Sequence, residues 1–190
     1  MAKRLMIPRR EAMQLLLAVA STGALAACGN KAGDADGLDF KGGEFLNPKE
    51  MALLSALAQT IIPTTDTPGA AEVGVPQTLQ DLISNWGDNS LRVYWRQGLK
   101  ALNKHFLNVE GGGQFSNLSE PEQYSLLNAY DAAVYAGDVE DGFYKDLKHT
   151  VARAYYMSEV GASEELNYDP VPGDFLGDIP FADVGKAWAN

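Results

Sequence analysis

Cysteine and histidine are scarce in this chain, which has one cysteine and two histidines among its 190 residues. The single cysteine, Cys28, excludes an internal disulfide and any iron–sulfur or cysteine-rich zinc site made by this chain alone. His105 and His149 each lack a second histidine three or four positions away, which disfavours a metal site on a helix. The sequence therefore predicts no catalytic residue, no metal site and no cofactor site in this chain.

Basic residues are also in the minority. The chain has 15 Lys and Arg against 25 Asp and Glu, which gives a formal net charge of -10 at pH 7. An acidic surface repels nucleic acid and anionic lipid headgroups, so nucleic acid is not an expected partner. The charge favours solubility, and a docking face for a basic partner is the alternative. The length suits one folded domain.

The apolar run at residues 15–27 is too short and too interrupted for a comfortable membrane-spanning helix. It follows Arg9 and Arg10 and ends at Leu25-Ala-Ala-Cys28, which is the layout of a removable export signal over residues 1–27. The last four residues resemble a bacterial lipobox, in which Cys28 is lipidated. The alternative is an ordinary signal with a chance cysteine. Because several acyl chains anchor a protein stably, we expect lipid anchoring at Cys28, on the periplasmic side of the inner or outer membrane.

Arg9 and Arg10 leave two export routes open. They fit a twin-arginine signal, which serves proteins exported already folded, although Pro8 and Glu11 depart from its usual pattern. The general secretory route needs only basic residues at this place. Residues 28–46 are rich in Gly, Asp, Ala and Lys and are expected to form a flexible tether before the folded domain.

Apolar residues recur at helical spacing over residues 47–166, which predicts about five amphipathic helices in an all-α bundle. The first helix starts at Asn47-Pro-Lys-Glu50, a capping box with proline at the first helical position. The later helices are predicted to start at Pro76, at a Ser90 cap, at a Ser119 cap and near Val139. The last helix is predicted to end at Met157, with Gly161 as its terminator.

Four basic residues recur four apart on one face of the third predicted helix: Arg92, Arg96, Lys100 and Lys104. A solvated helix face is the simpler interpretation. Contact with an acidic partner or with lipid phosphate is the alternative.

The stretch Ile61-Ile-Pro-Thr-Thr-Asp-Thr-Pro-Gly-Ala70 separates the first two predicted helices. Pro63 forces Ile62 out of the helical region, and Pro68 with Gly69 favours a turn. The short side chains between the prolines, from Thr64 to Thr67, are expected to accept hydrogen bonds from backbone N–H groups. Asp66 is expected to cap the turn or to take part in binding.

Residues 167–190 change in character, since aromatic residues stand among glycine and proline. Tyr168, Pro172 and Gly173 belong to the segment Tyr168-Asp-Pro-Val-Pro-Gly173, which suits an extended arm. Such an arm lies either on its own bundle or on a neighbouring protein.

Several segments together resemble the gluconate 2-dehydrogenase subunit 3 family, over about Pro48 to Gly173. The segments occur in the family's order: Ile61 to Ala70, Val73-Gly-Val-Pro76, Gly98-Leu-Lys-Ala-Leu-Asn103, Phe143-Tyr-Lys-Asp-Leu-Lys148, Tyr155-Tyr156-Met-Ser-Glu-Val-Gly161 and Tyr168 to Gly173. Within them Pro63, Asp66, Pro68, Gly69, Tyr155, Tyr156, Gly161, Tyr168, Pro172 and Gly173 are candidates for partner contact or for a structural role.

The resemblance implies a small, non-catalytic subunit of a membrane-bound dehydrogenase of sugars, polyols or gluconate. Its partner would be a large flavoprotein of the glucose-methanol-choline oxidoreductase type that carries FAD. The partner subunits could also hold an iron–sulfur centre and haem, the latter in a multihaem cytochrome c. The resemblance further implies that the small subunit supports folding, export and anchoring of the large one.

Two other classes of function stay open. One is a free-standing periplasmic helical lipoprotein that acts in assembly or ligand binding. The other is an acid–base enzyme that uses carboxylates such as Asp66, Asp138 and Asp141, although acids at a helix start or in a turn have a simpler structural explanation. Glu164 and Glu165 are expected in a loop after the last helix.

Overall fold

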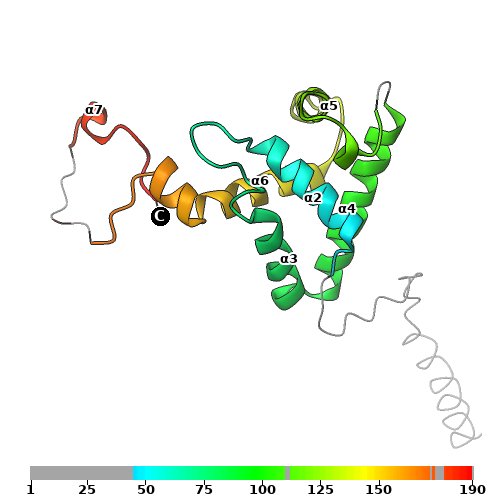
Figure 1. The fold of residues 1–190 in the computed structure, drawn as a ribbon, viewed down its shortest axis with the longest axis horizontal. Coiled ribbons are helices and arrows are strands. Elements are labelled where there is room, and N and C mark those ends of the chain that lie inside the picture. The colour runs from blue at the N-terminus through cyan, green and yellow to red at the C-terminus, as the bar shows by residue number, and fades with distance from the viewer. Residues whose placement is uncertain (1–44, 110–111, 172, 174–177, 190) are drawn as a thin grey trace, which may run out of the picture. The chain divides into compact units, whose positions relative to one another are not determined.

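The computed structural model describes residues 45–109, 112–171, 173 and 178–189. The predictions for Arg9, Arg10, Cys28 and Pro172 concern residues outside these ranges. The described elements in chain order are α2 (Pro48–Ile61), α3 (Val75–Trp86), α4 (Asn89–Asn108), the 3-10 turn η1 (Phe115–Asn117), α5 (Glu120–Ala136), α6 (Gly142–Tyr156), the π-helical turn η2 (Gly161–Glu165) and α7 (Phe181–Val184) (Figure 1).

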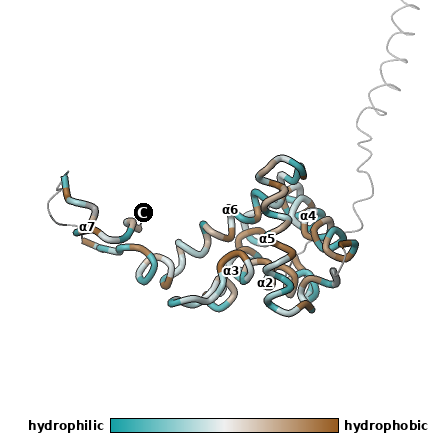
Figure 2. Tube along the Cα trace, turned by 90° about the horizontal axis from the view of Figure 1, so that it is seen from above, coloured by the Kyte–Doolittle hydropathy of each residue, from teal (hydrophilic) through white to brown (hydrophobic). Residues whose placement is uncertain are grey.

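The predicted all-α class with five amphipathic helices, α2 to α6, is confirmed. Among the described residues there is no strand, only one isolated bridge between Asn167 and Trp188. Hydrophobic and hydrophilic stretches alternate along the helices, as amphipathic packing requires (Figure 2). No helix in the described ranges combines the length and the apolar character that crossing a bilayer demands.

Helix α2 occupies the middle of the domain and contacts η1, α3, α4, α5 and α6 (Figure 1). Its predicted capping box is present, because the Asn47 side chain accepts the Glu50 N–H at 3.0 Å and Glu50 accepts the Asn47 N–H at 2.9 Å. Leu54 and Leu57 on its inner face are fully buried. Each contributes roughly 1.5–3 kcal/mol by burial, so packing holds this helix more than its intrinsic propensity does. Phe45, at the end of the expected tether, is also buried.

The predicted start of the third helix is wrong by two residues. Asp88, not Ser90, caps α4, because its carboxylate accepts the Leu91 N–H at 2.7 Å. The solvated-face interpretation is also wrong for two of the basic residues. Arg92 donates to the Ser84 carbonyl at 2.5 Å near the end of α3, and Arg96 pairs with Glu50 at 3.3 Å.

The last long helix departs from its prediction at both ends. Gly137 ends α5 in the left-handed conformation at φ 86. Helix α6 then begins at Gly142 instead of near Val139, because the Asp141 carboxylate caps it by accepting the Tyr144 N–H at 3.0 Å. The helix ends at Tyr156, and Gly161 does not terminate it: Gly161 opens η2, and its N–H donates to the Ser158 hydroxyl at 3.1 Å.

Helices α4 and α6 approach closely at Gly98. The Phe143 ring lies against it and packs edge-on to Tyr94 and Trp95, with ring centroids 5.5 Å apart in each case. A Cβ atom on Gly98 would lie 2.2 Å from a carbon of the Phe143 ring. Only glycine therefore permits this helix contact.

We expect Gly98→Ala to lower the free energy of unfolding by about 1–3 kcal/mol, because the buried ring must move. Urea denaturation of the purified protein measures this change. Gly142→Ala is the matched control, since a Cβ there meets no atom within 4 Å. Equal stability of the two variants would contradict the role given to Gly98.

Candidate functional site

The corner between α2 and α3, residues 61–70, is fixed mainly by side chains from its flanks. The Gln59 side chain accepts the Ala71 N–H at 2.9 Å, and Glu72 accepts the Gly69 N–H at 3.0 Å. The expectation that the corner threonines accept backbone N–H groups is wrong. Thr64 instead accepts from the Gln59 amide at 2.9 Å, and Thr67 interacts with side chains of the C-terminal half.

Tyr155 of α6 holds this corner from across the domain. Its hydroxyl donates to the Pro68 carbonyl at 3.0 Å and lies 3.2 Å from the Thr67 hydroxyl. Thr67 also donates to the Glu165 carboxylate in η2. Glu165 is therefore not a free loop residue. The corner meets the end of α6 and η2, which are 87 to 98 positions further along the chain, at one cluster of Thr67, Pro68, Tyr155 and Glu165, called here the corner cluster.

Two of the predicted glycines allow close approach near the corner cluster. A Cβ on Gly69 would lie 2.4 Å from the Gln59 amide nitrogen, and one on Gly161 would lie 2.1 Å from the Tyr155 carbonyl oxygen. Both positions are buried. Close packing therefore explains why glycine occupies these two positions, and no ligand is needed to explain it.

The other candidate residues lie at the surface. Pro63 follows the extended Ile62, as predicted, and is exposed. Asp66 is exposed, and among the described residues no hydrogen bond to its carboxylate is found. Gly173 is also exposed, whereas Tyr156 and Tyr168 are large aromatic residues with 46% and 61% of their surface exposed.

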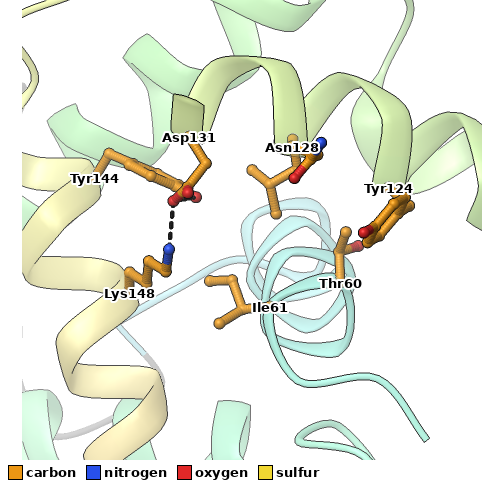
Figure 3. A pocket seen from close by; sticks show the side chains of 8 residues that line it. Thr60, Ile61, Tyr124, Asn128, Asp131, Tyr144 and Lys148 are labelled. Atoms are coloured by element: carbon orange, nitrogen blue, oxygen red, sulfur yellow. Dashed lines mark hydrogen bonds and ion pairs between the residues drawn. The ribbon is translucent and has the colours of Figure 1, made fainter. Parts of the chain in front are cut away.

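A pocket of about 130 Å³ opens where the end of α2 meets α5 and α6 (Figure 3). Lys148 and Asp131 face one another in it, with Nζ 2.5 Å from Oδ1, and Tyr144 donates to the same oxygen at 2.8 Å. Lys148 also lies 4.8 Å from the centroid of the Tyr135 ring. These contacts link α5 to α6 across the pocket, because the Lys148 ammonium and the Tyr144 hydroxyl both bind the Asp131 carboxylate.

Three tyrosines donate to carboxylates around α6, and their pKa values rise in consequence. The hydrogen bond to Asp146, at 2.5 Å, raises the pKa of Tyr94 to about 12. Burial, with a hydrogen bond to Asp141, raises the pKa of Tyr130 above its usual range. Burial and the bond to Asp131 raise the pKa of Tyr144 in the same direction.

The carboxylates proposed for acid–base chemistry have separate surroundings. Asp141 caps α6 with one oxygen and accepts from Tyr130 at 2.6 Å with the other. Asp138 and Asp66 are exposed. Among the described residues no group of three or more His, Cys, Asp and Glu side chains has the arrangement of a metal site.

The arm after η2 is closed on itself by Asn167. The Asn167 backbone N–H donates to the Ala187 carbonyl at 2.7 Å, and its carbonyl accepts the Ala189 N–H at 2.8 Å. The Asn167 side chain donates to the Val184 and Lys186 carbonyls at 2.8 and 3.1 Å. The described part of the arm thus joins its own two ends and includes one short helix, α7.

Most of these contacts could not be read from the sequence. Tyr155 and Pro68 are 87 positions apart, and Lys148 and Asp131 are 17 apart on different helices, so no spacing rule links them. The Tyr155 segment and the corner were both noted, but only the structure brings them together.

The fold is an all-α domain, and the residues of the corner cluster bind backbone and side chains of the same domain. The chain belongs to the gluconate 2-dehydrogenase subunit 3 family, whose model matches residues 48–173. That family name describes a subunit of a multi-subunit dehydrogenase. Searches of curated proteins and of solved structures gave no match.

We expect Tyr155→Phe to lower the free energy of unfolding by about 1–3 kcal/mol, because the partly buried Pro68 carbonyl loses its donor. Amide hydrogen exchange at Ala70, whose N–H donates to Ile62 at 2.9 Å, should become faster. Tyr156→Phe is the matched control, because within the described residues its hydroxyl forms no hydrogen bond. Exchange that is unchanged in Tyr155→Phe would contradict the role of the corner cluster.

The three tyrosines also predict a loss of stability in alkali. Tyrosine in an unfolded chain ionises near pH 10, whereas the folded chain keeps these protons to higher pH. The unfolded state then binds fewer protons, so stability is full below about pH 10 and falls as the pH rises above it. Unfolding measured from about pH 9 to about pH 11 tests this, and Tyr144→Phe should weaken the dependence. A decline equally steep in Tyr144→Phe would count against it.

Proposed function

We propose that this chain is the non-catalytic small subunit of a membrane-bound, FAD-dependent dehydrogenase of gluconate or another sugar or polyol. The large partner is a flavoprotein of the glucose-methanol-choline type, and a multihaem cytochrome c is a further candidate partner. The flavin, and any iron–sulfur centre or haem, belong to those partners and not to this chain. Family membership is the first support for this proposal.

The observation that carries the proposal is how the segments typical of the family contact one another. The corner joins the Tyr155 segment through the Pro68 carbonyl, and Gly98 admits Phe143 from another such segment. The polar groups at these contacts bind protein backbone and side chains of the same chain. Such residues specify the shape of a surface, which is what a subunit needs to bind a partner.

We further propose that the chain supports the folding and export of the large subunit and anchors it through lipid on Cys28. The leader, with Arg9 and Arg10, accounts for export by either of the two routes that its sequence permits. Lipid at Cys28 places the complex on the periplasmic side of the membrane.

The test is an affinity pull-down of the tagged protein from detergent-extracted membranes of its native host, with absorbance spectra and mass spectrometry of the bound chains. We expect a large flavin-containing chain to copurify and to oxidise a sugar, polyol or sugar acid with a dye acceptor. In Cys28→Ala the complex should move to the soluble fraction, because its lipid is lost.

Ser21→Ala, within the leader, controls for expression, since it changes no residue of the lipobox. Recovery of the chain alone, in detergent that keeps other respiratory complexes intact, would refute the subunit assignment and favour a free-standing lipoprotein. Dye reduction by the isolated chain would refute the non-catalytic assignment.

A further inference from the structure

A groove of about 550 Å³ runs between α3 and the C-terminal half of α6. Its walls include Val75, Leu79 and Leu82 from α3 and His149, Arg153 and Met157 from α6 and its end. It is separate from the pocket in Figure 3, which lies between α5, α6 and the end of α2. None of the segments noted in the sequence predicted it.

The groove exposes large apolar side chains. Leu82 is 51% exposed and Met157 is 73% exposed, although α3 has already buried Leu79 and Ile83 on its inner face. Trp86 stands four residues after Leu82 on the same side of α3 and is 85% exposed. Adjacent exposed apolar residues at the rim of a hollow are typical of a protein-binding surface.

The charge of the groove is opposite to that of the chain. Among the residues that the structure describes, no carboxylate lines it, although the chain has 25 Asp and Glu, and the charged or titratable lining residues are His149 and Arg153. Arg153 is exposed, and within the described residues its guanidinium forms no hydrogen bond or ion pair. A partner that fits must therefore bring apolar side chains together with a carboxylate.

The groove also continues to the base of the arm. A second hollow, of about 400 Å³, shares Met157 and Ser158 with it and is lined further on by Tyr156 and Tyr168. Apolar surface thus extends from α3 to the arm segment that the sequence had marked for partner contact. The α3 residues that line the groove lie between Val75 and Leu82, so at about 1.5 Å per residue this wall is about two helical turns long.

We propose that this groove binds an apolar helical segment of the large subunit, and that a carboxylate of that segment pairs with Arg153. This inference rests on the proposed function, because the occupant is the catalytic partner. A second copy of this chain fits less well. A two-fold interface centred on the groove would bring the two Arg153 guanidinium groups toward each other.

The experiment places a photo-crosslinking phenylalanine analogue at position 82 of the tagged full chain in its native host. The crosslinked peptide is then identified by mass spectrometry. Position 107 is the matched control, because Leu107 is 50% exposed on α4 and Leu82 is 51% exposed on α3. We expect position 82, and not position 107, to crosslink to an apolar segment of the large flavoprotein that contains Asp or Glu.

A charge swap then tests the ion pair. Arg153→Glu should reduce the recovered flavoprotein about tenfold or more, and Arg153→Lys should retain most of it. Changing the acid of the crosslinked segment to Arg should restore recovery with Arg153→Glu. Circular dichroism and the unfolding midpoint of Arg153→Glu should match the wild type, because the side chain is exposed.

Three outcomes would overturn the inference. In the first, the wild-type chain recovers the flavoprotein, Arg153→Glu has no effect on the recovery, and positions 82 and 107 crosslink equally. This result would refute binding at the groove and leave the proposed function standing. A crosslink from position 82 to a second copy of this chain would make the groove a self-association surface. If the wild-type chain recovers no flavoprotein, the proposed function and this inference are both refuted.

Discussion

The hydrogen bond from the Tyr155 hydroxyl to the Pro68 carbonyl joins the two halves of the domain. The corner between α2 and α3 contains two prolines, which supply no backbone donors, so it has few internal bonds with which to fix its own shape. Tyr155 is only 2% exposed and reaches the corner from the end of α6. That contact ties the corner to α6, while α3, which leaves the corner, packs directly against α2 and α6.

Local rules predicted much of the helical framework. The Asn47 capping box and the Ser119 cap depend on residues within a few positions of each other, and both are present. Ser90 failed as a cap because Asp88, an equally good cap residue, stands two positions earlier and its carboxylate bonds the Leu91 N–H. Gly161 was predicted to terminate a helix. In the structure, its lack of a Cβ instead allows the Tyr155 carbonyl to pack closely against it.

The site was predicted in its parts but not in its assembly. Tyr155, Pro68 and Gly69 were all singled out, yet nothing in the sequence shows that the first two are bonded. The same limit applies to the pairing of Lys148 with Asp131, which depends on how α5 and α6 are placed. The four basic residues spaced four apart on α4 were interpreted as a solvated face. In the structure two of them, Arg92 and Arg96, instead contact other segments of the chain.

The closure of the arm at Asn167 bears on how a partner would be recognised. A chain segment with free ends loses conformational entropy when it is captured, and this loss weakens binding. Here four hydrogen bonds at Asn167 have already brought residues 184–189 back to the start of the arm. Part of the entropy loss that a partner would otherwise cause on binding the arm has therefore already occurred when this chain folds. Tyr168 and Trp188, on the two sides of the closure, are held near each other before any encounter.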